Sequence, residues 1–272
     1  MTMKLFYLII ANLLIAVNSW AQQDAGEPLQ IDWETGPKTV SIADMAEIEL
    51  SEGYIFTGSE GTRILMENMQ NPISGTEVGF YAPEDSDWFI VFEFDSIGYV
   101  KDDEKSNLDA DAMLASMQAG NEASNEVRRE RGWETIDLIG WAKEPFYNPQ
   151  TNNLEWATLL RDESGEQIVN YNTRILGRKG VMAVTLVASP DELESILVGY
   201  QQAIGTYTYT SGNRYAEWTK GDKIAQYGLT GLVVGGGAAL AAKTGLLAKF
   251  WKLLLIPIIA VGAFFKRIFN KN

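Results

Sequence analysis

The chain has 272 residues, of which 36 are acidic and 22 basic, and it contains neither cysteine nor histidine. The lack of cysteine excludes a disulfide framework and a thiolate nucleophile, and the lack of histidine excludes a Ser-His-Asp triad, an imidazole base and a histidine-ligated metal. The net charge of −14 argues against a nucleic-acid partner, because phosphate groups are bound by lysine and arginine.

Residues 1–21 have the pattern of a secretory signal peptide. Lys4 provides a basic start, residues 5–17 are mostly apolar, and Ser19 and Ala21 place small residues at positions −3 and −1 of a cleavage site. The apolar stretch is shorter than the roughly 20 residues that a membrane-spanning helix needs. We therefore expect cleavage after residue 21; the alternative is an uncleaved N-terminal membrane helix.

An exported acidic domain is expected over residues 22–215. The elements predicted in its first part are strands at 39–42, 48–50, 54–56, 78–81 and 88–94, and a helix at 62–70. The last strand, 88–94, is almost entirely apolar or aromatic, which predicts a central strand buried on both faces.

A long helix is predicted from Asp109 to about Arg131. Its apolar residues follow the spacing of one helix face: Ala110, Met113, Leu114 and Met117. The Asp109 side chain can accept a hydrogen bond from the free N–H groups of the first turn, and Gly132 can end the helix.

Two hairpins and a second helix follow. The predicted strands are 135–146 with 154–161, and 168–176 with 181–188. Residues 189–192 (SPDE) have the pattern of a capping box with proline at the first helical position. The order of elements predicts an α+β fold, an antiparallel sheet of several hairpins covered by helices. Neither a dinucleotide fingerprint nor a Gly-Lys phosphate loop occurs, so no cofactor is expected.

The region 216–272 is expected to be a C-terminal membrane anchor. Residues 224–242 are uncharged over a length that can cross a bilayer, and Gly231 and Gly235 form a small-xxx-small pair that allows close helix packing, including homo-oligomers. A second apolar stretch covers about 244–265 and ends in basic residues. The positive-inside tendency favours one span followed by an interfacial helix, and two crossings remain the alternative.

Several short motifs, taken together, resemble a known family. They are Gly53-Tyr54, Asp87-Trp88-Phe89, residues 98–104 (GYVKDDE), residues 131–133 (RGW), Gly140-Trp141, and residues 170–174 (NYNTR). The chain is similar in these motifs to a bacterial membrane-anchored family catalogued as domain of unknown function 2167. The resemblance extends over nearly the whole chain and implies architecture and placement at the cytoplasmic (inner) membrane. Because the family has no established activity, it implies no catalytic residue.

Two clusters could bind a ligand. Asp102, Asp103 and Glu104 offer carboxylate oxygens from one loop, but the spacing of a calcium-binding EF-hand is missing, and a solvated loop explains the same residues, so no metal site is expected. The second cluster lies in the predicted strand 168–176. Alternation along this strand places Asn170, Asn172 and Arg174 of the NYNTR motif on one face.

This Asn-Asn-Arg face could bind a carboxylate or a sugar through fixed donors. It could equally be the solvent face of the sheet, with Arg174 paired to Glu155 or Asp137.

The leading functional hypothesis is a noncatalytic binding or assembly module, held at the membrane with its domain on the periplasmic side, whose partner is an envelope protein or a small ligand. The first alternative is a carboxylate-based hydrolase that acts on envelope polymers, because paired carboxylates are the acid–base groups that this sequence contains in quantity. The second alternative is a structural membrane protein that oligomerises through its glycine-rich helix.

Overall fold

The computed structural model describes residues 29–235. The expected signal peptide (1–21) and second apolar stretch (244–265) lie outside the described residues, as does the second half of the expected span (224–242). Within the described range, no helix is both long and apolar enough to cross a membrane. The account that follows concerns the unit that starts at Ile31.

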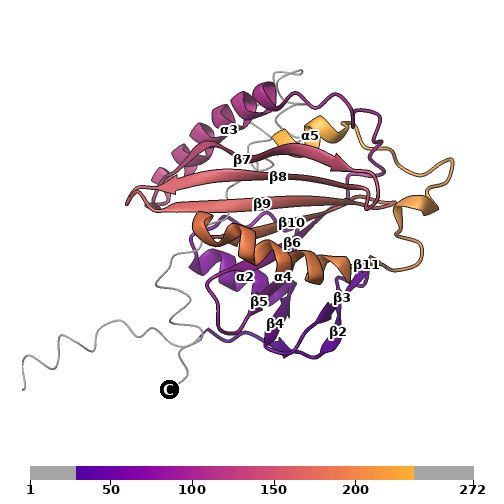
Figure 1. The fold of residues 1–272 in the computed structure, drawn as a ribbon, viewed down its shortest axis with the longest axis horizontal. Coiled ribbons are helices and arrows are strands. Elements are labelled where there is room, and N and C mark those ends of the chain that lie inside the picture. The colour runs from indigo at the N-terminus through magenta and orange to yellow at the C-terminus, as the bar shows by residue number, and fades with distance from the viewer. Residues whose placement is uncertain (1–28, 236–272) are drawn as a thin grey trace, which may run out of the picture. The chain divides into compact units, whose positions relative to one another are not determined.

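The strands of the described residues form two antiparallel sheets (Figure 1). The main sheet has the order β1-β4-β5-β6-β10-β9-β8-β7. Its strands are β1 (Glu34–Thr35), β4 (Tyr54–Gly58), β5 (Glu77–Pro83), β6 (Phe89–Asp95), β7 (Ile136–Asn148), β8 (Asn153–Asp162), β9 (Gln167–Leu176) and β10 (Val181–Ala188). The small sheet has the order β11 (Thr208–Tyr209), β3 (Ala46–Leu50), β2 (Lys38–Ile42). The expected antiparallel α+β fold is confirmed, and β6 is central as predicted.

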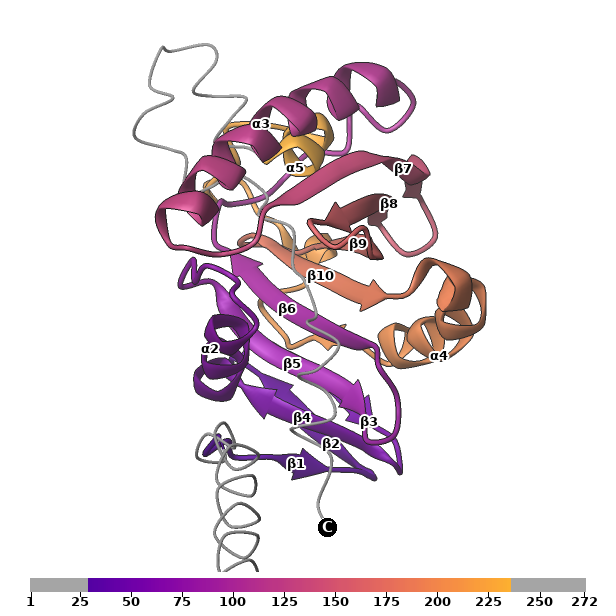
Figure 2. The ribbon, with the colours of Figure 1, turned by 90° about the vertical axis from the view of Figure 1, so that its left-hand side faces the viewer.

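Helices cover both faces of the main sheet. They are α2 (Ser59–Asn68), α3 (Ala110–Glu130), α4 (Leu193–Gly205) and α5 (Leu229–Val234), with short 3-10 turns η1 (Pro190–Glu192) and η2 (Tyr215–Glu217). Figure 2 shows α2 and α3 on one side of the sheet and α4 on the other. Strands β9 and β10 are thus buried on both faces, which strand alternation alone does not require of an antiparallel sheet.

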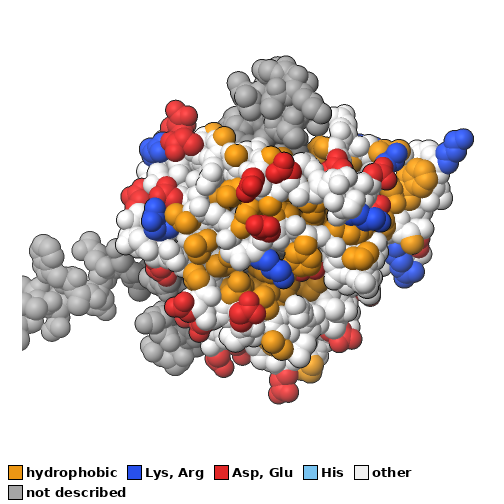
Figure 3. Space-filling view, turned by 45° about the horizontal axis from the view of Figure 1, so that its top comes forward, with side chains coloured by type: hydrophobic (Ala, Val, Ile, Leu, Met, Phe, Trp, Pro, Cys, Tyr) orange, Lys and Arg blue, Asp and Glu red, His pale blue; other side chains and the backbone are white. Residues whose placement is uncertain are grey.

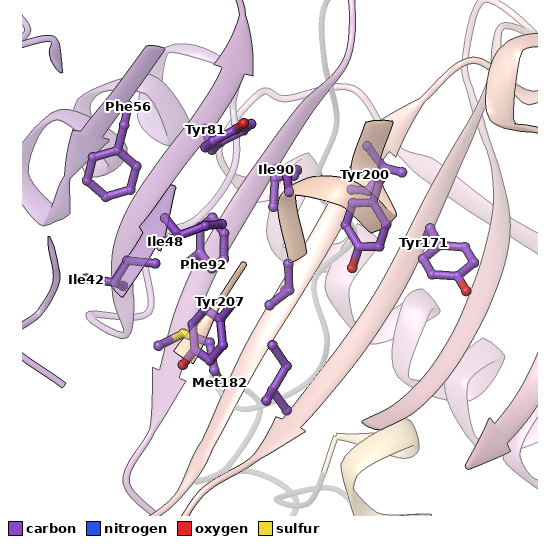
Figure 4. Close-up of a cluster of buried hydrophobic side chains, with 14 of the residues drawn as sticks. Ile42, Ile48, Phe56, Tyr81, Ile90, Phe92, Tyr171, Met182, Tyr200 and Tyr207 are labelled. Atoms are coloured by element: carbon purple, nitrogen blue, oxygen red, sulfur yellow. The ribbon is translucent and has the colours of Figure 1, made fainter. Parts of the chain in front are cut away.

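The face toward α4 carries the main apolar core. Phe92, Tyr171, Met182 and Tyr200 are fully or almost fully buried there, together with residues of the small sheet such as Ile48 (Figure 4). Burying one such side chain stabilises the fold by about 1.5–3 kcal/mol. Within this core the Tyr200 hydroxyl donates to Thr173 Oγ1 at 2.6 Å.

The start of α4 differs from the prediction. Ser189 occupies the cap position and Pro190 the first helical position, but the Ser189 side chain makes no capping hydrogen bond. Residues 190–192 form a 3-10 turn in which the backbone N–H of Glu192 donates to the Ser189 carbonyl at 3.2 Å. This tighter turn replaces the reciprocal side-chain bonds of a capping box, so that box is not formed.

The long helix α3 is confirmed within one residue at each end. Asp109 caps it by accepting a hydrogen bond from the Ala112 N–H at 3.0 Å, and Gly132 follows its end with a φ of 68°. Its polar side chains bind the start of β7: the buried Asn125 amide bonds both the N–H and the C=O of Ile136, each at 2.9 Å. These bonds hold α3 over the sheet face opposite the apolar core.

Candidate functional site

A cavity of about 160 Å³ lies on the sheet face that α3 covers. Its walls come from α2, the segment 71–77, α3 and strands β6 to β10, and Val234 at the end of α5 also lines it. Buried strand positions are normally apolar, yet the floor of this cavity is polar. It consists chiefly of Glu93, Asp95, Thr158, Asn170, Asn172 and Arg174.

Strand register places these side chains in rows across the sheet. Residues directly opposite each other in an antiparallel pair point to the same face. Glu93 of β6 lies opposite Ala183 of β10, which in turn lies opposite Arg174 of β9. In the same way Asn170 of β9 lies opposite Thr158 of β8. Ala183 therefore leaves open space between an acidic and a basic side chain.

Arg174 is a buried cation with few partners. The residue is 3 % exposed, its guanidinium lies 4.7 Å from the centre of the Trp156 ring, and the one side-chain hydrogen bond that it makes within residues 29–235, to the Thr173 carbonyl, is 3.5 Å long. The ion pairs within residues 29–235 all involve other cations. Burial lowers the pKa of Arg174, while Asp95 and Glu93 oppose that shift.

Two carboxyl groups face the same cavity from β6. Glu93 and Asp95 are two residues apart and share a strand face. Burial raises the pKa of Glu93 to about 7, and the charge of Asp95 adds to the shift. Burial also raises the pKa of Asp95, against the influence of Arg174. Near neutral pH, the Glu93 carboxyl group is therefore present both in its protonated form, which can donate a proton, and in its ionised form, which can accept one.

Two polar atoms in the cavity wall lack a partner. The side-chain Oδ1 of Asn170 and the Nε1 of Trp156 are buried without a hydrogen bond in the described part of the chain. The neighbouring Asn172 is satisfied, because its Nδ2 donates to the Asn170 carbonyl at 3.0 Å and its Oδ1 accepts from Thr185. Most buried polar groups in proteins are paired, so such atoms need an explanation.

The predicted Asn-Asn-Arg face is thus brought together in the cavity. The alternative, a solvent-exposed face with Arg174 paired to Glu155 or Asp137, is wrong because α3 and α5 cover this side of the sheet. Glu155 accepts a hydrogen bond from the Tyr171 hydroxyl on the other face, and Asp137 pairs with Arg161 at 3.3 Å.

The predicted acidic loop lies outside the cavity. Asp102 pairs with Lys105 at 3.0 Å, Asp103 is exposed, and Glu104 Oε2 accepts from the backbone N–H of Thr230 at 2.8 Å, in the first turn of α5. Glu104 therefore holds α5 in place. Among residues 29–235, no group of three or more acidic side chains could hold a metal ion.

The glycine pair lies at the end of the described range. Gly231 is buried in α5, where an added Cβ would meet the Tyr227 ring at 2.6 Å. Gly235 ends the helix with a φ of 74°. Packing of this pair against a second membrane helix stays a prediction.

Sequence reasoning missed the acidic half of the cavity. Glu93 and Asp95 fall at the end of the apolar run 88–94, and a charged residue inside a strand expected to be buried on both faces was the available clue. The role of Ala183 could not be found from the sequence, because it depends on register. In the cavity, acidic and basic side chains lie on different strands, whereas on the molecular surface seen in Figure 3 acidic, basic and hydrophobic side chains are interspersed.

Comparisons with known proteins give a family but no activity. The model of a family described as "Protein of unknown function (DUF2167)" matches residues 34–265. No curated protein matches the sequence. Among solved structures, the solution structure of cyanobacterial PsbP (CyanoP) from Synechocystis sp. PCC 6803 is 11% identical and covers 70% of this chain and 99% of its own, with a TM-score of 0.37. A likeness at that score supports no argument about fold or function.

Proposed function

Because the chain belongs to the DUF2167 family of proteins of unknown function, we propose its role from its geometry: it is a noncatalytic binding module that holds a small polar ligand in the cavity between α3 and the main sheet. The observation that carries this proposal is Arg174, which is 3 % exposed and makes no ion pair within residues 29–235.

The energetic argument is that the site is incomplete by itself. A buried polar atom without a partner costs about 1–3 kcal/mol, and a buried charge costs more. Asn170, Trp156 and Arg174 all present unused hydrogen-bonding capacity to one cavity. A ligand that supplies the missing partners stabilises the folded chain, because it binds that state selectively.

The placement that we propose for this module is the outer side of a bacterial cytoplasmic membrane, with the C-terminal apolar segments as anchor and an envelope protein as a possible further partner. The signal pattern at 1–21 and the apolar stretch at about 244–265 support it. Residues 229–234, in the first part of the uncharged stretch 224–242, pack against the domain as α5, so the anchor that we propose begins after them. A reporter that works only after export, fused after residue 215, is expected to be active in cells. An inactive, cytoplasmic reporter would contradict the placement.

The binding proposal is tested by filling the cavity. We expect acetate, inorganic phosphate, glycerol or glycine to raise the melting temperature of the full-length protein in a concentration-dependent way. Ala183→Leu, which places a larger side chain between Glu93 and Arg174, should abolish that rise. The control is Val198→Leu on α4, where the side chain is 59 % exposed.

Overpacking can lower stability by about 1–3 kcal/mol, so a second variant is needed. Thr158→Val removes one cavity hydroxyl at nearly constant volume and should weaken binding while leaving the fold intact. The proposal fails if none of the four probes changes the melting temperature, or if Ala183→Leu responds to them as the unmodified chain does.

A second candidate function is a carboxylate-based hydrolase. It is favoured by the adjacent Glu93 and Asp95, of which Glu93 has a pKa of about 7 and could act as a general acid at neutral pH. This candidate predicts that Glu93→Gln abolishes a hydrolytic activity at an unchanged melting temperature. The small cavity volume of about 160 Å³ fits a small substrate better than a polymer.

A further inference from the structure

We propose that the ligand of this cavity is a zwitterionic amino acid, whose carboxylate binds Arg174 and whose ammonium group binds Glu93 and Asp95. The inference rests on the proposed binding function and names the chemical class of its ligand. It stands on three observations: a cation that makes no ion pair within residues 29–235 at one end of the cavity, the carboxyl groups of Glu93 and Asp95 at the other, with Glu77 of β5 opposite Glu93, and an open space between the two ends.

The cationic end is built to receive a carboxylate. A guanidinium presents five donors in a planar fork that matches the two oxygens of a carboxylate. Within residues 29–235, Arg174 uses one of these donors in a 3.5 Å bond to the Thr173 carbonyl, and its guanidinium carbon lies 4.7 Å from the centre of the Trp156 ring. The unpartnered Nε1 of Trp156 adds a donor in the same wall.

The acidic end is built to receive a cation. Glu93 Oε1 accepts from the hydroxyls of Ser74 at 3.3 Å and Thr76 at 3.2 Å, which orient the carboxyl group. Asp95 follows on the same strand face and borders the same cavity. Glu93 and Asp95 are partly buried, and the two carboxyl groups repel each other when both are ionised; an ammonium group between them removes that cost.

The distance between the two ends suits a small zwitterion. Glu93 and Arg174 flank Ala183 on the strands to either side, so their backbones are about 10 Å apart, two strand spacings. No ion pair joins Arg174 to either acid within the described chain, although both influence its pKa. The cavity of about 160 Å³ accommodates a ligand of roughly six non-hydrogen atoms, the size of benzene.

The decisive experiment is calorimetric titration of the full-length protein in detergent at pH 7. The zwitterions are glycine, β-alanine and γ-aminobutyrate, which share both charged groups and differ in the distance between them. The singly charged probes are acetate and propionate on one side and methylamine and ethylamine on the other. We expect at least one zwitterion to bind about 10-fold more tightly than every singly charged probe.

Variants then assign the two ends. Glu93→Gln and Asp95→Asn should each weaken binding of the preferred zwitterion about 10-fold without weakening acetate binding, because each removes a negative charge that acts on Arg174. Glu84→Gln, the same change at an exposed acid, is the matched control and should have no effect. Arg174→Met should abolish binding of both zwitterion and acetate, and Arg174→Lys should restore part of it; melting curves show which variants fold.

The outcomes separate this inference from the proposed function. If acetate or propionate binds as tightly as every zwitterion, the inference that the ligand is a zwitterion is wrong. The proposed binding function then stands, with an anion as the ligand. An amine that binds as tightly as the zwitterions overturns the inference as well. If none of these probes binds, the inference fails, and the proposed function is then decided by phosphate and glycerol with the Ala183→Leu variant. The ligand comparison needs no variant, so a misfolded mutant cannot obscure the result.

Discussion

The residue with the clearest consequence for stability is Glu93. A carboxyl group whose pKa is higher in the folded than in the unfolded chain binds its proton more tightly in the folded state. Burial, Asp95 and Glu77 raise the pKa of Glu93 from 4.5 to about 7, while Arg174 opposes them. Its contribution to the free energy of unfolding is therefore complete below about pH 4.5 and is lost as the pH rises to 7.

Glu93→Gln should consequently flatten the pH dependence of stability. The free energy of unfolding, measured with urea, should fall between pH 5 and pH 7 in the unmodified chain. The fall should be smaller in the variant, by on the order of 1 kcal/mol. The exposed Glu84→Gln control should follow the unmodified chain. Equal slopes for Glu93→Gln and the unmodified chain would mean that Glu93 is ionised at both pH values.

Single residues also show how far the sequence predicts the site. Alternation correctly grouped Asn170, Asn172 and Arg174 on one face, because side-chain direction in a strand is a local property. Their burial is not local, since it depends on α3, whose attachment to β7 brings together residues distant in the chain. The contribution of Ala183 is likewise visible only when three strands are in register.

The sequence predicts those helices and strands that have a strong local pattern of apolar residues. It does not predict the short strands that exist only because a neighbouring strand pairs with them. The helix α3 and strands β7 to β10 have long periodic patterns bounded by turns, and their limits were found within a few residues. The two-residue strands β1 and β11 have no pattern of their own and exist because β4 and β3 pair with them. The capping box at Ser189 failed because a 3-10 turn competes with it there.

The attachment of α3 to β7 leads to a prediction for this pair of elements. Asn125 is 2 % exposed and bonds both backbone groups of Ile136. Asn125→Ala should lower the free energy of unfolding by about 1–3 kcal/mol, because it removes the acceptor of the buried Ile136 N–H, while the Ile136 C=O keeps its bond from Asn121 Nδ2 at 2.9 Å. Denaturant unfolding measures this loss.

The control for this prediction is Asn68→Ala, which removes an exposed side chain bonded within its own helix and should change stability by less than about 0.5 kcal/mol. An Asn125→Ala chain as stable as this control would show that β7 does not need the bonds from α3.

At the scale of the whole unit, the cover of the cavity is assembled from segments far apart in the chain. The loop with Glu104 bonds the first turn of α5, and α5 ends at Val234 in the cavity wall. Glu104→Ala should therefore loosen α5 without disturbing the sheet. Hydrogen exchange is expected to become at least 10-fold faster at residues 229–234 and to stay unchanged in β9 and β10.

Asp103→Ala serves as the matched control for that experiment, since it removes a neighbouring exposed acid from the same loop. It should leave exchange in α5 unchanged. Faster exchange in both variants would attribute the effect to the charge of the loop, and no change in either would show that apolar contacts with residues such as Leu154 and Val181 hold α5 without Glu104.

The main sheet keeps its apolar core on the α4 face and its charged cavity on the α3 face. This separation has an evolutionary consequence. Substitutions that reshape the cavity leave the packing around Phe92 and Tyr200 intact, so selection can alter ligand preference with little risk of losing the fold. Related chains are therefore expected to diverge in recognition at cavity positions outside the shared motifs, such as Glu93 and Ala183, sooner than in the apolar layer on which their folding depends.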